Sequence, residues 1–63
     1  MVGKILEYDK NAGIGYVLGF DDITYIFRRS SLENDIELEK NDIIKFDCLL
    51  FEEMPEAVRI EKR

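Results

Sequence analysis

Short runs of β-branched and aromatic residues, recurring within only 63 residues, are the feature that most constrains this fold. The runs span residues 2–8, 14–18, 23–28, 43–51 and 57–62. Gly, Asn, Asp and Pro separate them, which is typical of strands joined by turns, whereas a sustained apolar stripe at helical spacing is missing from the sequence. A chain of this length supports one compact core, so we expect a single all-β domain over residues 1–63.

Alternation within the runs predicts which side chains fill the interior, because every second residue of a strand lies on the same face. The residues predicted to point inward are Ile23, Tyr25, Phe27, Ile44, Phe46, Cys48, Leu50, Val58 and Ile60. The polar stretch 30–42 is expected to carry no more than a helical turn. Strands at this spacing form a sandwich or a closed barrel, and closure is favoured in so short a chain because it removes exposed sheet edges.

Several classes of function are disfavoured by residue types that the chain lacks. There is no histidine to act as a general base near neutral pH, and Ser30 and Ser31 have no evident activating partner. The single cysteine, Cys48, provides neither an internal disulfide nor a zinc site. We therefore expect a protein that is not an enzyme, with no catalytic residues, no metal and no cofactor.

Two further expectations concern the location of the protein and the effect of its charge on ligand binding. The sequence opens without a basic and apolar leader and has no apolar run as long as a membrane span, so a cytoplasmic location without a membrane partner is expected. The net charge of −5 by itself disfavours nucleic acid, because non-specific binding to phosphates is mainly electrostatic. Since a basic face on an acidic protein still binds phosphates, the positions of the Lys and Arg side chains decide whether nucleic acid is a possible ligand.

Two segments of the chain are similar to the two motifs of a known family. They are Ala12-Gly13-Ile14-Gly15-Tyr16-Val17 and Ile26-Phe27-Arg28-Arg29-Ser30. With residues 3–9, 38–47 and 54–60, they make the chain resemble the cold-shock domain family, whose two ribonucleoprotein motifs read Lys-Gly-Phe-Gly-Phe-Ile and Phe-Phe-His-Arg-Ser. The resemblance implies a five-stranded antiparallel Greek-key barrel, an OB-fold of the cold-shock type, that binds single-stranded nucleic acid.

The chain departs from the family where aromatic rings would stack on bases. Glu7 occupies the family's Trp position, and Ile14, Ile26 and Arg28 stand where the family has ring-bearing residues. Tyr16 keeps a ring at an outward motif position. Because each stacking contact is worth about 1–3 kcal/mol, the resemblance implies weak binding with little sequence preference.

The candidate contacts form an outward face that is apolar in its middle and basic at its rim. Its expected residues are Lys4, Ile14, Tyr16, Ile26, Arg28, Arg29 and Lys45. Tyr16, Arg28 and Arg29 are the main predicted contacts, because a guanidinium both stacks on bases and pairs with phosphate. Lys4 and Lys45 are expected to assist electrostatically.

Structural roles compete with binding roles at three positions. Arg28 and Arg29, at a strand end, either contact a ligand or pair with Glu33 or Asp35. Phe20 either covers the barrel end or stacks on a ligand. The residue types alone do not decide between these roles.

Two functions remain open at this stage. The first is a cold-shock-like chaperone or regulator that binds single-stranded RNA or DNA. The second is a protein-interaction module with an OB-fold that has lost nucleic-acid binding. In that case Leu6, Ile14 and Ile26 form an apolar patch for a protein partner or a second copy of the chain.

Overall fold

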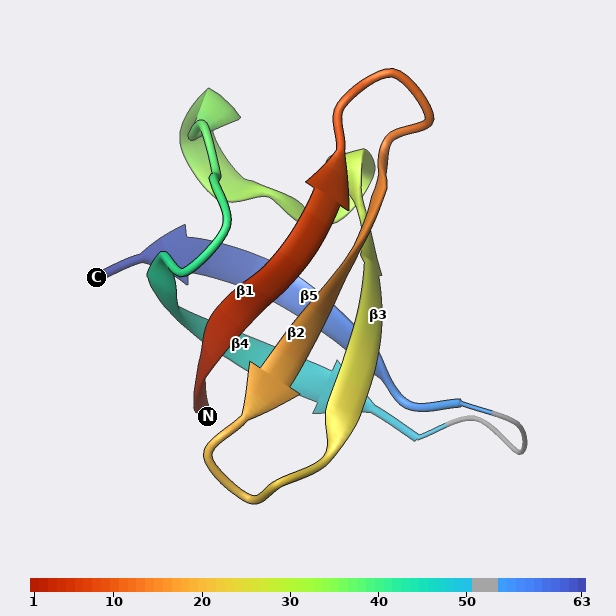
Figure 1. Ribbon diagram of the computed structural model, residues 1–63, viewed down its shortest axis with the longest axis vertical. Coiled ribbons are helices and arrows are strands. Elements are labelled where there is room, and N and C mark those ends of the chain that lie inside the picture. Colours follow the sequence, from red (N-terminus) through yellow and green to blue (C-terminus); the bar gives the residue numbers. More distant parts are fainter. Residues whose placement is uncertain (51–53) are drawn as a thin grey trace.

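The computed structural model of the protein describes residues 1–50 and 54–63, and these residues form five β-strands (Figure 1). They are β1 (Val2–Asp9), β2 (Ile14–Gly19), β3 (Thr24–Arg28), β4 (Ile43–Leu49) and β5 (Glu56–Lys62). Two short 3₁₀ helices follow β3, namely η1 (Arg29–Ser31) and η2 (Glu33–Asp35). Each strand begins within one residue of its predicted start, so the reading of the runs as strands is confirmed. The predicted end of the fourth strand at Phe51 lies outside the described residues.

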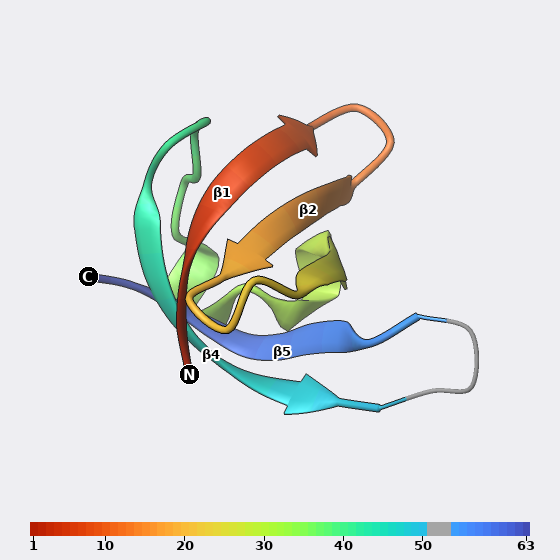
Figure 2. The same cartoon turned by 60° about the horizontal axis from the view of Figure 1, so that its bottom comes forward.

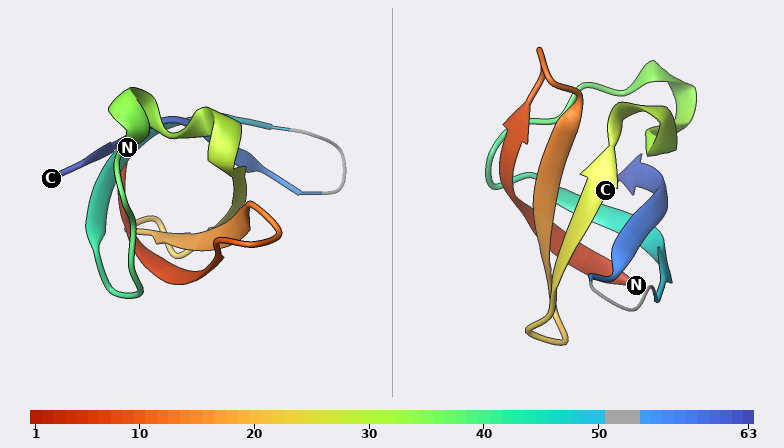
Figure 3. Two further views of the ribbon diagram at one scale, coloured as in Figure 1. Left: turned by 90° about the horizontal axis from the view of Figure 1, so that it is seen from above. Right: turned by 90° about the vertical axis from the view of Figure 1, so that its right-hand side faces the viewer.

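The strands close into a barrel in the order β1-β2-β3-β5-β4, which Figure 3 shows end-on as a ring. The β1–β2, β2–β3, β4–β5 and β1–β4 pairs are antiparallel. The expected five-stranded barrel of the OB-fold type is confirmed, but β3 and β5 pair in parallel through Ile26 and Glu56. The predicted antiparallel barrel therefore has one parallel junction. Strand direction cannot alternate at every junction of a closed ring of five, so one pair must be parallel.

Apolar side chains from all five strands and from the segment before β4 fill the barrel. The residues buried in the core are Ile5, Val17, Tyr25, Phe27, Leu38, Ile44, Phe46, Ala57 and Ile60. The inward prediction is confirmed for Tyr25, Phe27, Ile44, Phe46 and Ile60. In the view of Figure 2 the β1–β2 hairpin lies above the β4–β5 hairpin, and the two are joined where β1 pairs with β4. Among the described residues, no helix has the length and hydropathy needed to cross a membrane.

Three residues predicted to lie in the core are exposed because they lie at the ends of the barrel wall. Cys48 is exposed near the end of β4, and Leu50, beyond that end, is 80% exposed. Ile23 precedes the start of β3 and is 44% exposed. Alternation predicts the face on which a residue lies, but the position at which the wall ends depends on the neighbouring strands.

A bulge in β5 overturns the inward prediction for Val58. The pairing shifts between Lys45 and Asp47, so that two residues of β5 oppose one residue of β4. Arg59, within the bulge, has a φ of 48°. As a result Ala57 and Ile60 are both buried, whereas Val58 is only half-buried. A bulge inserts one unpaired residue and thereby resets the alternation of the strand.

A hydrogen bond at one end of the barrel predicts an alkaline limit to stability. The Tyr25 hydroxyl donates to Asp21 Oδ2 at 2.6 Å, and this bond, together with burial, raises the pKa of Tyr25 to about 12. Since tyrosine in an unfolded chain titrates near 10, this stabilisation is complete below pH 10 and is lost as the pH rises toward 12. We expect the melting temperature of the wild-type protein to fall more steeply in that range than that of Tyr25→Phe. Equal slopes would contradict the assignment.

Candidate nucleic-acid interface

The outward side of β2 is apolar along its length. Ile14 and Tyr16 point outward and are 42% and 38% exposed, and Leu18 continues the same row as a half-buried side chain. Gly15 and Val17, which alternate with them, are buried. This strand therefore presents an aromatic ring between two aliphatic side chains, which is an apolar surface that does not belong to the core.

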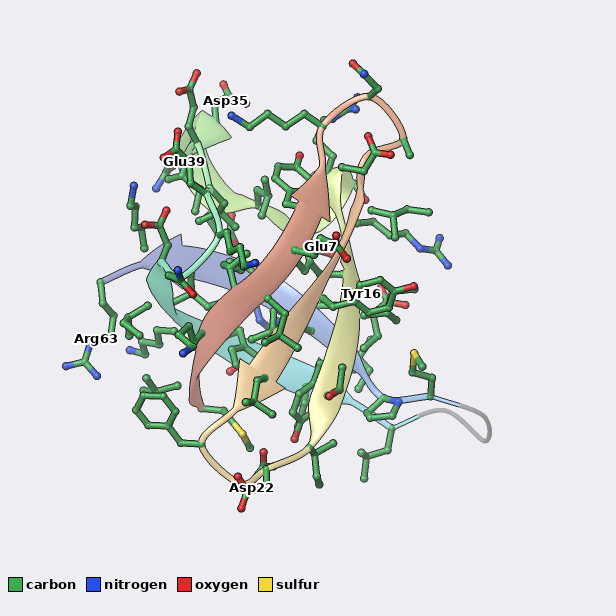
Figure 4. All side chains as sticks on the ribbon, in the orientation of Figure 1. Glu7, Tyr16, Asp22, Asp35, Glu39 and Arg63 are labelled. Carbon is green, nitrogen blue, oxygen red and sulfur yellow. The ribbon has the colours of Figure 1, made fainter. Side chains whose placement is uncertain are left out.

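Strand register extends this surface across β1 and β3. The outward residues that oppose one another form three rows, Asp9–Ile14–Arg28, Glu7–Tyr16–Ile26 and Lys4–Leu18–Thr24. We call these nine residues the β1–β3 face. Opposed residues of adjacent strands have Cβ atoms about 4.5–5.5 Å apart, so each row is a continuous contact surface. Figure 4 shows Glu7 and Tyr16 close together on it.

A second bulge determines which β1 side chain lies next to Tyr16. Ile5 pairs with Val17 and Glu7 pairs with Tyr16, which leaves Leu6 as the extra residue on β1. Bulges commonly re-aim a side chain in this way. The carboxylate of Glu7 is therefore exposed beside the ring of Tyr16, and Leu6, half-buried in the bulge, lies outside the three rows.

Opposite charges lie along the two edges of the β1–β3 face. Glu7 and Asp9 make its β1 edge acidic, and they share a hollow of about 440 Å³ with Ile14 and Tyr16. Arg28 lies at the β3 edge, where its guanidinium is 4.0 Å from the carboxylate of Glu56 and its side chain is 69% exposed. The Glu56 side chain is only 15% exposed, but at this separation the pair is weak, and the exposed guanidinium remains accessible to a ligand.

Arg29 holds the β1–β2 turn in place. Its guanidinium donates to the backbone oxygen of Lys10, and its backbone N–H donates to the oxygen of Gly13 at 2.9 Å. Gly13 has a φ of 73° and lies against the same guanidinium. Within the described chain neither arginine forms a salt bridge with Glu33 or Asp35, so the predicted alternative pairing is wrong.

The two predicted lysines lie at different places on the barrel. Lys4 belongs to the β1–β3 face. Lys45 lies on β4, opposite Val2 of β1 and Glu61 of β5, and lines a separate hollow that includes Asp47. The structure therefore brings Ile14, Tyr16, Ile26 and Arg28 together with Lys4, places Arg29 next to them, and leaves Lys45 outside. Alternation predicts an outward side chain without predicting which strands lie beside it.

The position of Phe20 extends the face beyond the end of β2. Phe20 is 69% exposed and lines a hollow of about 580 Å³ together with Lys4, Leu18 and Ile43. Since these neighbours belong to the outer surface of the barrel, the alternative in which Phe20 covers the barrel end is wrong. In the sequence, the signal for this position was an aromatic residue just after a predicted strand. Only the fold showed which residues lie beside it.

The comparisons with known proteins do not assign the chain to a family. No protein-family model matches it, and no curated protein is significantly similar to it in sequence. Within residues 1–50 and 54–63, no three His, Cys, Asp or Glu side chains are grouped to hold a metal ion.

Proposed function

We propose that this protein binds single-stranded RNA or DNA, weakly and with little sequence preference, through the β1–β3 face. The observation that carries the proposal is the arrangement of Tyr16, Ile26 and Arg28 on adjacent strands, with an exposed ring, an aliphatic side chain and an exposed guanidinium. An aromatic ring stacks on any base, and a guanidinium stacks on bases or pairs with phosphates. The resemblance to the cold-shock domain supports this choice and suggests a nucleic-acid chaperone or a regulator of transcription or translation.

The acidic edge of the face limits the affinity. Glu7 lies directly opposite Tyr16, where it repels the phosphates of a strand that stacks on the ring. The net charge of −5 adds a long-range repulsion. We therefore expect a dissociation constant near the weak end of non-specific binding, about 10⁻⁴ M at physiological salt.

The test is a backbone amide NMR titration of the labelled protein with oligo-deoxythymidine and a mixed-sequence RNA, at low and moderate salt. We expect shifts at Tyr16, Ile26 and Arg28, and an affinity that falls by about 0.7 log units per neutralised phosphate for each log unit of salt. Tyr16→Ala should weaken binding about fivefold to 150-fold, because it removes a stacking contact of about 1–3 kcal/mol. Tyr16→Phe keeps the ring and should bind like the wild type. A spectrum that no oligonucleotide changes, even at low salt, would refute the proposal.

A protein-interaction module is the alternative that the same face supports. Ile14 and Tyr16 on β2 form an apolar surface between the acidic β1 edge and Arg28. Such a surface suits a protein partner that presents both apolar and charged groups. The solution mass distinguishes one such partner. A dimer that Ile14→Ser converts to monomers, in a protein that binds no oligonucleotide, would favour this alternative.

A further inference from the structure

Phe20 is the most exposed aromatic side chain among the described residues. Phe20 is 69% exposed, whereas Tyr16 is 38% exposed. The backbone beneath it is held in place, because its N–H donates to the oxygen of Val2 at 3.0 Å and Asp22 closes the turn with a hydrogen bond to Gly19. A large apolar ring on a fixed backbone, outside the core, has the properties of a contact surface for a ligand.

The hollow beside Phe20 combines apolar and charged walls. Leu18 and Ile43 supply aliphatic side chains, Lys4 supplies a cation and Asp22 an anion. Lys4 lies opposite both Leu18 and Ile43 in the strand pairing, so its side chain stands between them. Within the part of the chain that the structure describes, Lys4 forms no salt bridge. A ring beside such a cation suits a base whose phosphate pairs with the ammonium group.

The hollow is continuous with the face on which the proposed ligand lies. Leu18 belongs to its lining and is two residues from Tyr16 on β2, a separation of about 7 Å along the strand. We infer that a single strand bound across Tyr16 continues along β2, so that a further base stacks on Phe20 and a phosphate pairs with Lys4. This inference rests on the proposed function and adds to it a second stacking ring and a minimum length of about four nucleotides.

The experiment compares Phe20→Ala with Ile23→Ala. Ile23 is a matched control, because it is a 44%-exposed apolar residue of the same β2–β3 connection but does not line the hollow. Both variants should remain folded, since neither side chain belongs to the core. Affinities are measured for a dinucleotide, a tetranucleotide and an octanucleotide of deoxythymidine, with amide shifts recorded at Lys4, Leu18 and Phe20.

We expect the affinity of the wild type and of Ile23→Ala to rise with oligonucleotide length. Phe20→Ala should lose this rise and bind the octanucleotide about fivefold to 150-fold more weakly, because one stacking contact is removed and the strand engages the face at one point. Binding of the dinucleotide, which occupies Tyr16 alone, should change little.

Two results would overturn the inference in different ways. In the first, oligonucleotides shift Tyr16 and Arg28 but not Phe20, and Phe20→Ala binds the octanucleotide as the wild type does. This result would exclude the hollow from the binding site and leave the proposed function intact. If no oligonucleotide shifts any residue, both proposals fail. In that case a dimer that Phe20→Ala converts to monomers would assign the hollow to a second copy of the chain.

Discussion

Gly15→Ala is expected to lower the free energy of unfolding by about 3 kcal/mol or more, which is a third or more of the roughly 3–9 kcal/mol expected for a domain this small. A Cβ at position 15 would lie 2.6 Å from the backbone oxygen of Glu7 and closer still to the ring of Phe27. Phe27 is fully buried, and the backbone of Glu7 is paired with Tyr16 of β2, so neither the ring nor the oxygen moves without opening the barrel. Urea unfolding followed by circular dichroism measures the loss.

Gly13→Ala is the matched control for this effect. Gly13 lies two residues away and has a φ of 73°, but a Cβ there would meet the end of the Arg29 side chain at 3.0 Å. The exposed end of that side chain needs to shift only slightly and can keep its hydrogen bond to Lys10, so we expect a loss of only about 1 kcal/mol, mainly from backbone strain. Equal urea midpoints for Gly15→Ala and the wild type would contradict the prediction, because they would show that the barrel accommodates a Cβ at position 15.

Glu7→Trp is expected to raise the affinity for single-stranded oligonucleotides about tenfold to several hundredfold. The bulge at Leu6 places residue 7 on the outside, directly opposite Tyr16, where an indole ring would extend the stacking surface. The gain combines a stacking contact of about 1–3 kcal/mol with the removal of an anion from beside the phosphates. Because the natural chain contains no Trp, quenching of the introduced indole reports binding at this position directly.

Glu7→Gln separates the two contributions to that gain. It removes the charge without adding a ring, so we expect a smaller increase in affinity that fades as salt is raised. The gain from Glu7→Trp should persist at higher salt, because stacking is less sensitive to screening than charge repulsion is. An affinity for Glu7→Trp no greater than that of the wild type would contradict the placement of bases over Tyr16.

The local alternation of the sequence was sufficient to predict the strands and much of the core. Tyr25, Phe27, Ile44 and Phe46 are buried as predicted, because two-residue periodicity depends only on the geometry of an extended backbone. The same reasoning placed Tyr16 on the outside of β2. A closed barrel was also predictable, since so short a chain has few other ways to cover its sheet edges.

Alternation failed wherever a residue's environment depended on a partner strand. The bulges at Leu6 and Arg59 shift the register, and they decide that Glu7 lies beside Tyr16 and that Val58 leaves the core. Cys48 is exposed for a related reason, because it lies near the end of β4, where the barrel wall stops.

The site residues divide in the same way. The sequence alone determined that Tyr16 and Arg28 are outward residues of the second and third strands, because this property is local. Only the tertiary structure decided that Arg29 braces a turn, that Lys45 belongs to another surface and that Phe20 adjoins the proposed site. These outcomes depend on contacts between residues far apart in the chain, and strand pairing rather than residue type brings them together.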